Sequence, residues 1–245
     1  MSTPRFYCPN PLPAGHTIQL PENAAVHATR ALRLQVGDQV ILFNGDGYDY
    51  TGLLTSVRKQ EVSARIEQQI PKENESPLRV TLAQAISSGD RMDFTIQKAV
   101  EMGVHSIQPI SSQRSIVKLS GERADKRREH WQNVAISACE QSGRAYVPSV
   151  AAPLSLPQWL ASADEFALKL TLDPLAQPSL AQLTAPTGSI CLLIGPEGGL
   201  SEAEIRLAHD HGYQGVRLGP RILRTETAAL ATIAAMQALW GDLAS

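Results

Sequence analysis

The stretches LLIGPEGGLSEAEI, residues 192 to 205, and LGPRILRTETAALATIAAMQALWG, residues 218 to 241, lie close together near the end of the chain. Each contains a glycine-bearing loop that follows a strand-like run and leads into a helical pattern. Glycine is favoured where the backbone turns sharply or comes close to a ligand. The two loops are therefore candidates for a binding edge.

The overall composition is that of an ordinary globular protein. The chain has 245 residues and a formal net charge of -2, with 43% hydrophobic, 5% aromatic and 19% charged residues. This length allows one large or two unequal domains. No apolar run approaches the ~18 residues of a transmembrane helix, and the start, MSTPRFYCPN, lacks the apolar stretch of a signal peptide. We therefore expect a cytoplasmic protein without a membrane partner.

Metal sites are not expected. Cys8, Cys139 and Cys191 are far apart without C-x-x-C pairing, which argues against a disulfide framework and a zinc site. We expect them to be buried thiols that pack as small hydrophobic groups. His209 and His211 stand two positions apart on a predicted helix, roughly 200° around its axis, so they face opposite ways.

The first third of the chain is predicted to form a small β domain. A short helix is expected over 21–33, followed by an apolar strand, a turn at 45–47 and a second strand over 50–57. Asp-Gly between two β-prone runs is typical of a hairpin. Strand-like alternation continues from Val62. The polar stretch PKENESP, residues 71–77, is bounded by prolines and is the best linker in the chain. It predicts domains over 1–72 and 76–245.

Beyond the linker the pattern becomes α/β. Strands are expected over 79–86 and 104–110, with a helix between them over 90–103, and further buried strands over 167–174 and 190–196. Strands that alternate with helices predict a largely parallel sheet covered on both faces. Ligands bind such sheets at the carboxyl ends of the strands. Three loops meet this description: 172–174, 195–199 and 218–224.

Common ligand motifs are absent from these loops. There is no G-x-x-x-x-G-K-[ST] for a triphosphate, no G-x-G-x-x-G for a dinucleotide and no G-x-S-x-G serine elbow. Ser201 and Glu204 form a capping box that begins a helix directly after the second loop. What remains is a glycine loop suited to an adenosine-like ligand that backbone groups recognise.

Two other features bear on partners. The helix expected from Thr225 or Glu226 is apolar on nearly every side, so a sheet and a further surface, such as a second subunit, must bury it. The run QRSIVKLSGERADKRREH, residues 113–130, is rich in basic residues. It is either a solvated helix start or a source of phosphate contacts.

The chain resembles a known family through several motifs taken together. These are GPEGGLSEAE, LGPRILRTETAA, GDRMDFTIQKAVEMGV, SACEQSGRAYVP and the N-terminal RFY. They are similar to the RsmE family of small-subunit (16S) ribosomal RNA uridine N3-methyltransferases, within the SPOUT superfamily. The resemblance implies an N-terminal PUA-like RNA-binding β-barrel, a trefoil-knotted parallel-sheet methyltransferase domain, S-adenosylmethionine as cofactor and a homodimer. The implied partner is small-subunit ribosomal RNA or the assembled small subunit.

The resemblance also implies roles for individual residues. The implied cofactor-binding residues are Leu172, Ile194, Gly195, Pro196, Glu197, Gly198, Gly199, Leu218, Gly219, Ile222, Leu223 and Thr225. Here the glycines let main chain approach a flat ligand, and the leucines and isoleucines offer apolar contact to an adenine.

Methyl transfer to uridine N3 needs loss of a proton and stabilisation of charge on the base. Arg224 and Glu226 flank the last loop and are the expected catalytic residues, although a carboxylate in a first helical turn is also favoured by the helix dipole alone. Arginine suits phosphate by its bidentate geometry, and the expected RNA contacts are Arg5, Arg30, Arg33, Arg114 and Arg144. Two alternatives stay open: a non-catalytic RNA-binding assembly factor, and a superfamily member that methylates another acceptor such as a transfer-RNA ribose 2′-hydroxyl.

Overall fold

The structure is a computed structural model that describes residues 3–162, 166–173 and 175–244. It divides into two compact units, Met1–Glu75 with Cys139–Val147, and Ser76–Ala138 with Pro148–Ser245. The division at Glu75 falls inside the stretch 71–77. Residues 139–147 join the first unit through contacts between segments distant in sequence, which composition does not reveal. The domain spans 1–72 and 76–245 stay a prediction.

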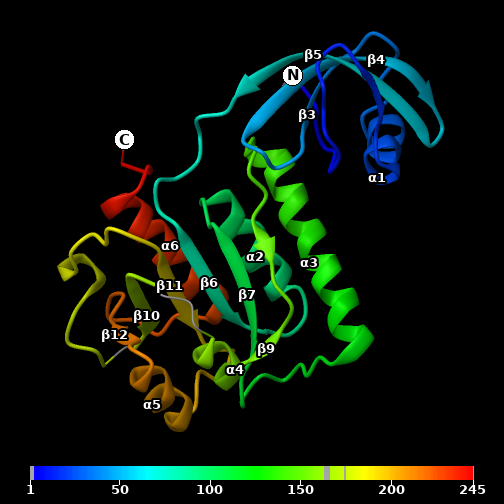
Figure 1. Cartoon of the computed structure of the whole chain (residues 1–245). Coiled ribbons are helices and arrows are strands. Elements are labelled where there is room, and N and C mark those ends of the chain that lie inside the picture. Colours follow the sequence, from blue (N-terminus) through cyan, green and yellow to red (C-terminus); the bar gives the residue numbers. More distant parts are fainter. Residues whose placement is uncertain (1–2, 163–165, 174, 245) are drawn as a thin grey trace. The chain divides into compact units, whose positions relative to one another are not determined.

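The first unit is built on a five-stranded sheet (Figure 1). Its strands follow the order β1-β3-β4-β5-β2, and every pairing is antiparallel except β1 with β3. The bounds are β1 Arg5–Tyr7, β2 Thr17–Gln19, β3 Gln39–Phe43, β4 Tyr48–Arg58 and β5 Glu61–Pro71. The predicted hairpin is the β3–β4 pair. Phe6, Leu42, Leu54 and Ile66 form the centre of its buried core.

The helix predicted over 21–33 is shorter and irregular. It consists of α1, Glu22–Val26, followed by a π-helical turn η1, His27–Ala31. The Thr29 hydroxyl donates to the carbonyl oxygen of Ala25 at 2.9 Å. Such bonding back to the preceding turn competes with regular helix geometry. Arg33 then takes a left-handed backbone conformation, φ 53°, which ends the helix.

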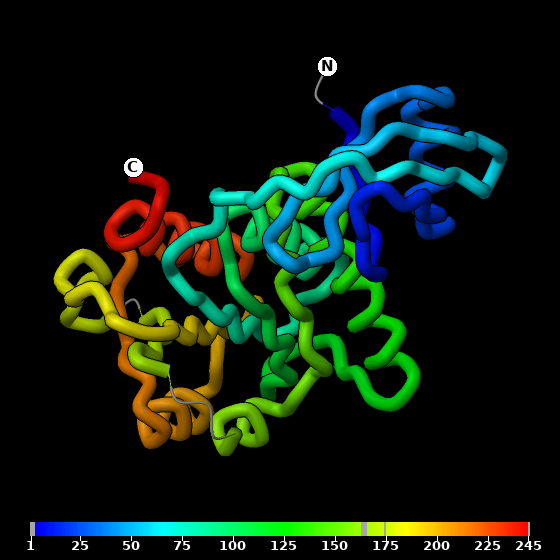
Figure 2. Tube along the Cα trace, turned by 45° about the horizontal axis from the view of Figure 1, so that its top comes forward, coloured from blue at the N-terminus to red at the C-terminus, as the bar shows by residue number. Residues whose placement is uncertain are grey.

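The second unit contains a seven-stranded sheet whose order is β12-β10-β11-β6-β7-β8, with β9 also on β7. All its pairings are parallel, which confirms the predicted α/β class. The bounds are β6 Val80–Ala85, β7 Ser106–Ser111, β8 Ser149–Val150, β9 Leu154–Ser155, β10 Leu168–Leu172, β11 Ile190–Ile194 and β12 Gln214–Val216. The segments that carry β10, β11 and β12 lie side by side in both views (Figure 1 and Figure 2).

Helices cover this sheet because strand side chains alternate between its faces. Cys191 and Leu193 of β11 pack against α4 and α5 in one buried cluster. Helix α6 packs against α2 and against strands β6 and β11. The bounds are α2 Arg91–Glu101, α3 Gly121–Ser142, α4 Leu156–Ala161, the 3-10 turn η2 Leu180–Gln182, α5 Glu202–Asp210 and α6 Thr225–Trp240. The predicted capping box of Ser201 and Glu204 is present at the start of α5.

The register brings several loops to one edge of the sheet. Ile194 pairs with Gln84, Thr171 pairs with Leu193, and Leu172 pairs with Val216. The strands are parallel, so the loops that follow β10, β11 and β12 leave from the same edge. This is the edge at which ligands bind in such sheets.

Candidate functional site

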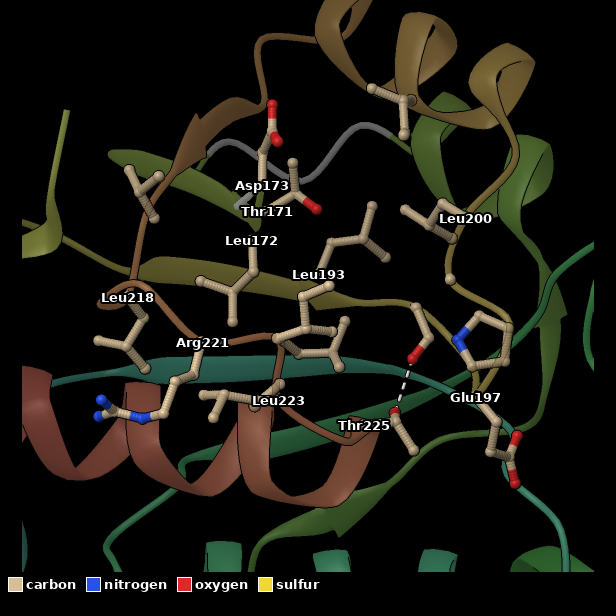
Figure 3. A pocket seen from close by; sticks show the side chains of 18 of the residues that line it. Thr171, Leu172, Asp173, Leu193, Glu197, Leu200, Leu218, Arg221, Leu223 and Thr225 are labelled. Atoms are coloured by element: carbon tan, nitrogen blue, oxygen red, sulfur yellow. Dashed lines mark hydrogen bonds between the residues drawn. The ribbon is translucent and has the colours of Figure 1, made fainter. Parts of the chain in front are cut away.

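A cavity of about 290 Å³ lies at this edge (Figure 3). The loops after β10, β11 and β12 and the first turn of α6 line it. Leu172, Leu193 and Leu223 are among the apolar side chains that gather there. We call it the cofactor-side cavity. The described residues of the three loops singled out in the sequence are thus brought together, and Pro174 of the first loop lies outside the described residues.

Most residues predicted to bind the cofactor line this cavity. They are Leu172, Ile194, Gly195, Pro196, Glu197, Gly199, Leu218, Gly219, Ile222, Leu223 and Thr225. Gly198 is not among them, and a Cβ added there would lie 3.5 Å from the side chain of Arg114. Asp173 and Arg221 also line it and lie within loops that the sequence singled out, whereas sequence reasoning missed Thr171, Leu193, Leu200, Ile205, His209, Val216 and Ala228. The sequence could have indicated Ile205 and His209, because positions four apart on the helix after the capping box share a face.

Gly195 is required by close packing of the main chain. A Cβ added there would lie 2.9 Å from the backbone nitrogen of Leu200 and 3.2 Å from the carbonyl carbon of Gly199. The loop closes on itself, with Gly199 donating from its backbone nitrogen to the carbonyl oxygen of Pro196 at 2.8 Å. Gly199 also has a left-handed φ of 68°, which glycine adopts without strain. The loop therefore holds its main chain close to the cavity.

Thr225 connects helix α6, the glycine loop and strand β6 through hydrogen bonds. Its hydroxyl donates to the carbonyl oxygen of Gly195 at 2.6 Å and accepts from Nε2 of Gln84 at 2.9 Å. Gln84 is fully buried in β6, and its Nε2 also donates to the carbonyl oxygen of Ala85 at 3.0 Å. Strand β6, the glycine loop and helix α6 are thus connected by hydrogen bonds. The sequence signal that could have indicated Gln84 is a glutamine within an otherwise apolar strand-like run.

The Glu197 carboxylate joins the glycine loop to the start of α2. Its Oε1 accepts from the backbone nitrogen and the hydroxyl of Ser88, both at 2.8 Å, and from Nη1 of Arg91 at 2.9 Å. Partial burial alone would raise the pKa of Glu197, but the hydrogen bonds from Ser88 and Arg91 outweigh it and lower the pKa below its ordinary value. The carboxylate is therefore a stable anion at neutral pH.

A second cavity, of about 430 Å³, borders this contact. Its lining residues are Ser88, Gly89, Asp90, Arg91, Phe94 and Glu226. Glu226, predicted to be catalytic, thus lines this cavity and not the cofactor-side cavity. Its Oε2 is buried and has no hydrogen-bond partner among the described residues. Arg224 precedes α6 as an exposed residue and lines neither of the two cavities.

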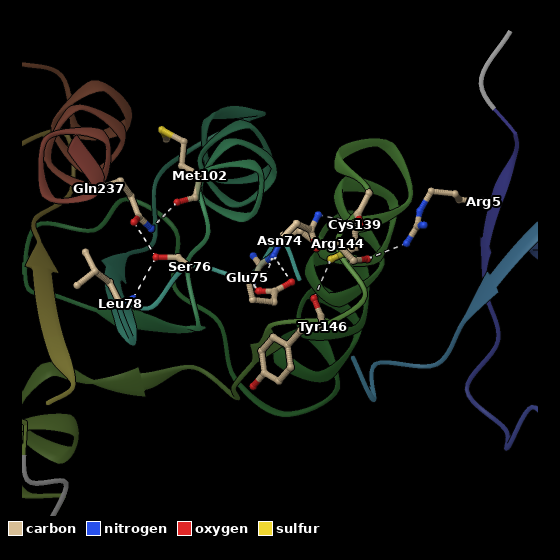
Figure 4. Close-up of polar contacts among 11 residues, drawn as sticks. Arg5, Asn74, Glu75, Ser76, Leu78, Met102, Cys139, Arg144, Tyr146 and Gln237 are labelled. Atoms are coloured by element: carbon tan, nitrogen blue, oxygen red, sulfur yellow. Dashed lines mark hydrogen bonds and ion pairs between the residues drawn. The ribbon is translucent and has the colours of Figure 1, made fainter. Parts of the chain in front are cut away.

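The arginines predicted to contact RNA fall into different environments. Arg5 pairs with Asp49 at 2.6 Å and lies over the ring of Phe43. Arg144 is buried and pairs with Glu75 at 2.6 Å (Figure 4). Both therefore stabilise the first unit, and an RNA contact is not needed to explain them.

The other three arginines are exposed. Arg30 lies in η1, and Arg33 follows it. Arg114 donates to the carbonyl oxygen of Gly198 at 2.9 Å, so it also supports the glycine loop.

The remaining predictions concern cysteines, metals and membranes. All three cysteines are buried and none forms a disulfide, as predicted. Burial raises the pKa of Cys8 and of Cys139 to about 12. In the part of the chain that the structure describes, no group of three or more His, Cys, Asp or Glu side chains is placed to hold a metal ion. No helix in that part is both long and apolar enough to cross a membrane.

Comparison with known proteins agrees with this architecture. An RNA methyltransferase domain model matches residues 74–237, and an RNA methyltransferase PUA domain model matches residues 20–67. The ribosomal RNA small subunit methyltransferase E of Buchnera aphidicola is 34% identical, with 98% of each chain covered. That of Bacillus subtilis is 37% identical, with 86% of this chain and 85% of the relative covered.

Solved structures give the same result. The ribosomal RNA small subunit methyltransferase E of Neisseria gonorrhoeae, bound to S-adenosyl methionine, is 46% identical with a TM-score of 0.92 over 99% of this chain and 100% of that one. A methyltransferase of Legionella pneumophila in complex with the same cofactor is 40% identical with a TM-score of 0.96 over 99% and 100% of the two chains. The predicted PUA domain and parallel-sheet methyltransferase domain are thereby confirmed, and the trefoil knot stays a prediction. The chain belongs to the ribosomal RNA small subunit methyltransferase E (RsmE) family of RNA methyltransferases.

Proposed function

We propose that this chain transfers the methyl group of S-adenosylmethionine to N3 of a uridine in 16S ribosomal RNA of the small subunit. One observation carries the proposal. The glycine loop and its two neighbouring loops form a single cavity at the carboxyl edge of the sheet, in a chain 46% identical to a family member bound to this cofactor. The protein is an enzyme, and its cofactor is S-adenosylmethionine.

The cavity fits this cofactor in size and chemistry. A volume of about 290 Å³ approaches that of small-molecule sites. Leucine and isoleucine side chains such as Leu218 and Ile222 offer apolar contact to an adenine. Gly195 and Gly199 line the cavity, so main-chain groups of the glycine loop are available to a ligand there. Asp173 supplies a carboxylate at the rim for a hydroxyl or a cationic group.

The reaction exchanges one bond to carbon for another. The bound cofactor supplies an electrophilic methyl carbon on a sulfonium; uracil N3 forms the new C–N bond while the C–S bond breaks, its electron pair stays on sulfur, and the N3 proton leaves. The chain must therefore accept that proton and stabilise negative charge on the base. In this proposal Glu226 accepts the proton. Arg224, at the start of the same helix, binds a uracil oxygen or a phosphate.

RNA contacts fall mainly to exposed arginines. Arg30 and Arg33 are exposed in the PUA unit and are free of the ion pairs that hold Arg5 and Arg144. Arg114 is exposed beside the glycine loop. Phosphate contacts of this kind give binding that weakens as salt rises. N3 lies on the pairing edge of uracil, so the target must be unpaired or flipped into the site.

The proposal includes a homodimer that acts in the cytoplasm. Helix α6 packs against α2 and the sheet, yet Leu239 near its end is 47% exposed, and Leu243 beyond it is 58% exposed. A second copy of the chain is the expected cover for this apolar surface. The cytoplasm is where ribosomal RNA of the small subunit is found. Parallel reactions with free RNA and with assembled small subunits identify which of the two is the substrate.

The test is incubation with small ribosomal subunits that lack the modification, or with their RNA, and labelled S-adenosylmethionine. The product is digested to nucleosides and analysed by mass spectrometry. We expect 3-methyluridine at one position. A 2′-O-methylated nucleoside would assign the chain to another reaction of the superfamily, and binding without methyl transfer would assign it to subunit assembly.

A further inference from the structure

The second cavity lies directly beside the cofactor-side cavity. Thr225 lines the cofactor-side cavity, and its neighbour Glu226 lines the second. Glu197 lines the cofactor-side cavity too, and its carboxylate binds Ser88 and Arg91, which line the second. The two cavities are therefore adjacent and separated by these side chains. We propose that the second cavity, called the acceptor cavity below, receives the uracil ring to be methylated; this inference rests on the proposed function.

The side chain of Phe94 offers a surface on which a base can stack. It extends from the first turns of α2 and is 47% exposed. Within the described part of the chain no aromatic ring packs against it. A single exposed phenylalanine is normal at a protein surface, but this ring lines the cavity and is therefore available to a ligand there. Flipped bases in RNA and DNA enzymes stack on aromatic or apolar side chains, which makes a base a suitable partner.

The charges in the acceptor cavity favour a base over a phosphate. Two carboxylates, those of Asp90 and Glu226, face a single guanidinium, that of Arg91. Arg91 is already paired with Glu197 at 2.9 Å. The net negative charge of the cavity would repel a phosphate, whereas it does not repel the neutral uracil ring. Phosphate contacts must therefore be made outside this cavity.

The polar groups match the pairing edge of uracil. That edge presents an N–H donor, N3, between two carbonyl acceptors. Oε2 of Glu226 is buried, so the carboxylate, which lines the cavity, accepts from N3–H through its other oxygen, Oε1. Among those residues only Nη1 of Arg91 is engaged, so its Nε and Nη2 remain to donate to a uracil oxygen. Cytosine has an unprotonated N3, which repels a carboxylate, so the acceptor cavity selects uracil over cytosine.

Phe94 gives the cleanest test, because it lines the acceptor cavity and not the cofactor-side cavity. Three variants are compared with the unchanged protein: Phe94→Ala removes the ring, Phe94→Tyr keeps it, and Gln97→Ala changes an exposed residue one turn further along α2 outside the cavity. Each is measured for S-adenosylmethionine affinity by calorimetry, for sedimentation, and for the rate of a single turnover on unmodified small subunits at saturating cofactor. Binding of uridine and cytidine 5′-monophosphates is followed by saturation-transfer NMR in the presence of S-adenosylhomocysteine.

We expect Phe94→Ala to slow the single turnover at least about tenfold and to weaken the transfer signal of the uridine nucleotide. Cofactor affinity and sedimentation should not change. Gln97→Ala should behave like the unchanged protein, and Phe94→Tyr, which keeps an aromatic ring, should retain more of the single-turnover rate than Phe94→Ala. Uridine monophosphate should give a stronger signal than cytidine monophosphate, and Glu226→Gln should reduce this difference.

Two results would overturn the inference while the proposed function stands: normal methylation and nucleotide binding by Phe94→Ala, or a Phe94→Ala variant that dissociates into monomers, which would place Phe94 in a subunit interface. If the unchanged protein methylates no small-subunit RNA at all, the proposed function itself fails.

Discussion

The hydroxyl of Thr225 donates a 2.6 Å hydrogen bond to the carbonyl oxygen of Gly195, thirty residues earlier in the chain. This bond ties the first turn of α6 to the glycine loop. Through the same hydroxyl, Gln84 joins the pair from strand β6 at 2.9 Å. Thr225 thus holds the loop that lines the cofactor-side cavity, and Gln84 holds Thr225.

Replacing Thr225 with valine should weaken S-adenosylmethionine binding about tenfold. The change keeps the shape of the side chain, but leaves the Gly195 carbonyl and the Gln84 amide without this partner, which costs about 1–3 kcal/mol. Calorimetry measures the affinity. Thr232→Val is the matched control, because Thr232 is buried in the same helix, donates to the carbonyl oxygen of Ala228 at 2.7 Å and does not itself line the cavity. Equal losses of affinity in the two variants would contradict the role given to Thr225.

Adding one methyl group to the glycine loop should have opposite outcomes at two neighbouring positions. Gly195→Ala places a Cβ 2.9 Å from a backbone nitrogen, which must move, and overpacking of this kind costs about 1–3 kcal/mol. Cofactor affinity should fall at least about fivefold. Gly198→Ala meets only the Arg114 side chain, at an ordinary 3.5 Å, and should bind normally. Tight binding by Gly195→Ala, on a folded protein, would argue against the close approach of the backbone.

The contribution of Glu197 to stability should depend on pH in one direction. Its pKa is lowered in the folded state, so the carboxylate stabilises the fold above its unfolded pKa of about 4.3, and this stabilisation is lost as pH falls through the lower folded value. The difference in unfolding free energy between the unchanged protein and Glu197→Gln should be constant from about pH 8 to pH 5 and shrink below about pH 4. Urea unfolding at several pH values measures it. A difference that changes between about pH 6 and pH 8 would be inconsistent with this assignment.

Arg144→Ala should destabilise the protein by about 3 kcal/mol, because it leaves Glu75 without the partner it has in a largely buried ion pair. Arg30→Ala, at an exposed position, should change stability by less than about 0.5 kcal/mol and instead weaken RNA binding in a salt-dependent way. Chemical unfolding and filter binding at two salt concentrations separate these effects. A stable Arg144→Ala protein with poor RNA binding would restore Arg144 as an RNA contact.

The sequence predicted much of this architecture because its signals are local. Alternating strands and helices, the Ser201 capping box and the hairpin turn at 45–47 each depend on residues close in the chain. Glycine loops after apolar strands likewise indicated the cofactor-side cavity, since parallel strands end at one edge. The buried state of Cys191 followed from its place within a fully buried strand.

The rest could not be predicted because it depends on contacts between distant segments. The sequence favours RNA contacts for Arg5 and Arg144, because their partners Asp49 and Glu75 stand 44 and 69 residues away in the chain. The sequence predicts that Glu197 binds the cofactor. Its carboxylate also binds Ser88 and Arg91, more than a hundred residues earlier, and therefore lies between two cavities. Neither composition nor periodicity carries such information.

The most direct test of the central claim is to map the methylated atom on small-subunit RNA. The unchanged protein and the Glu226→Gln variant are each incubated with unmodified small ribosomal subunits and labelled S-adenosylmethionine, and the RNA is digested and analysed by mass spectrometry. We predict 3-methyluridine at one position with the unchanged protein, and at least a hundredfold slower formation with Glu226→Gln, whose cofactor affinity stays normal. Label on a ribose hydroxyl or on another base, or no label at all, would contradict the account.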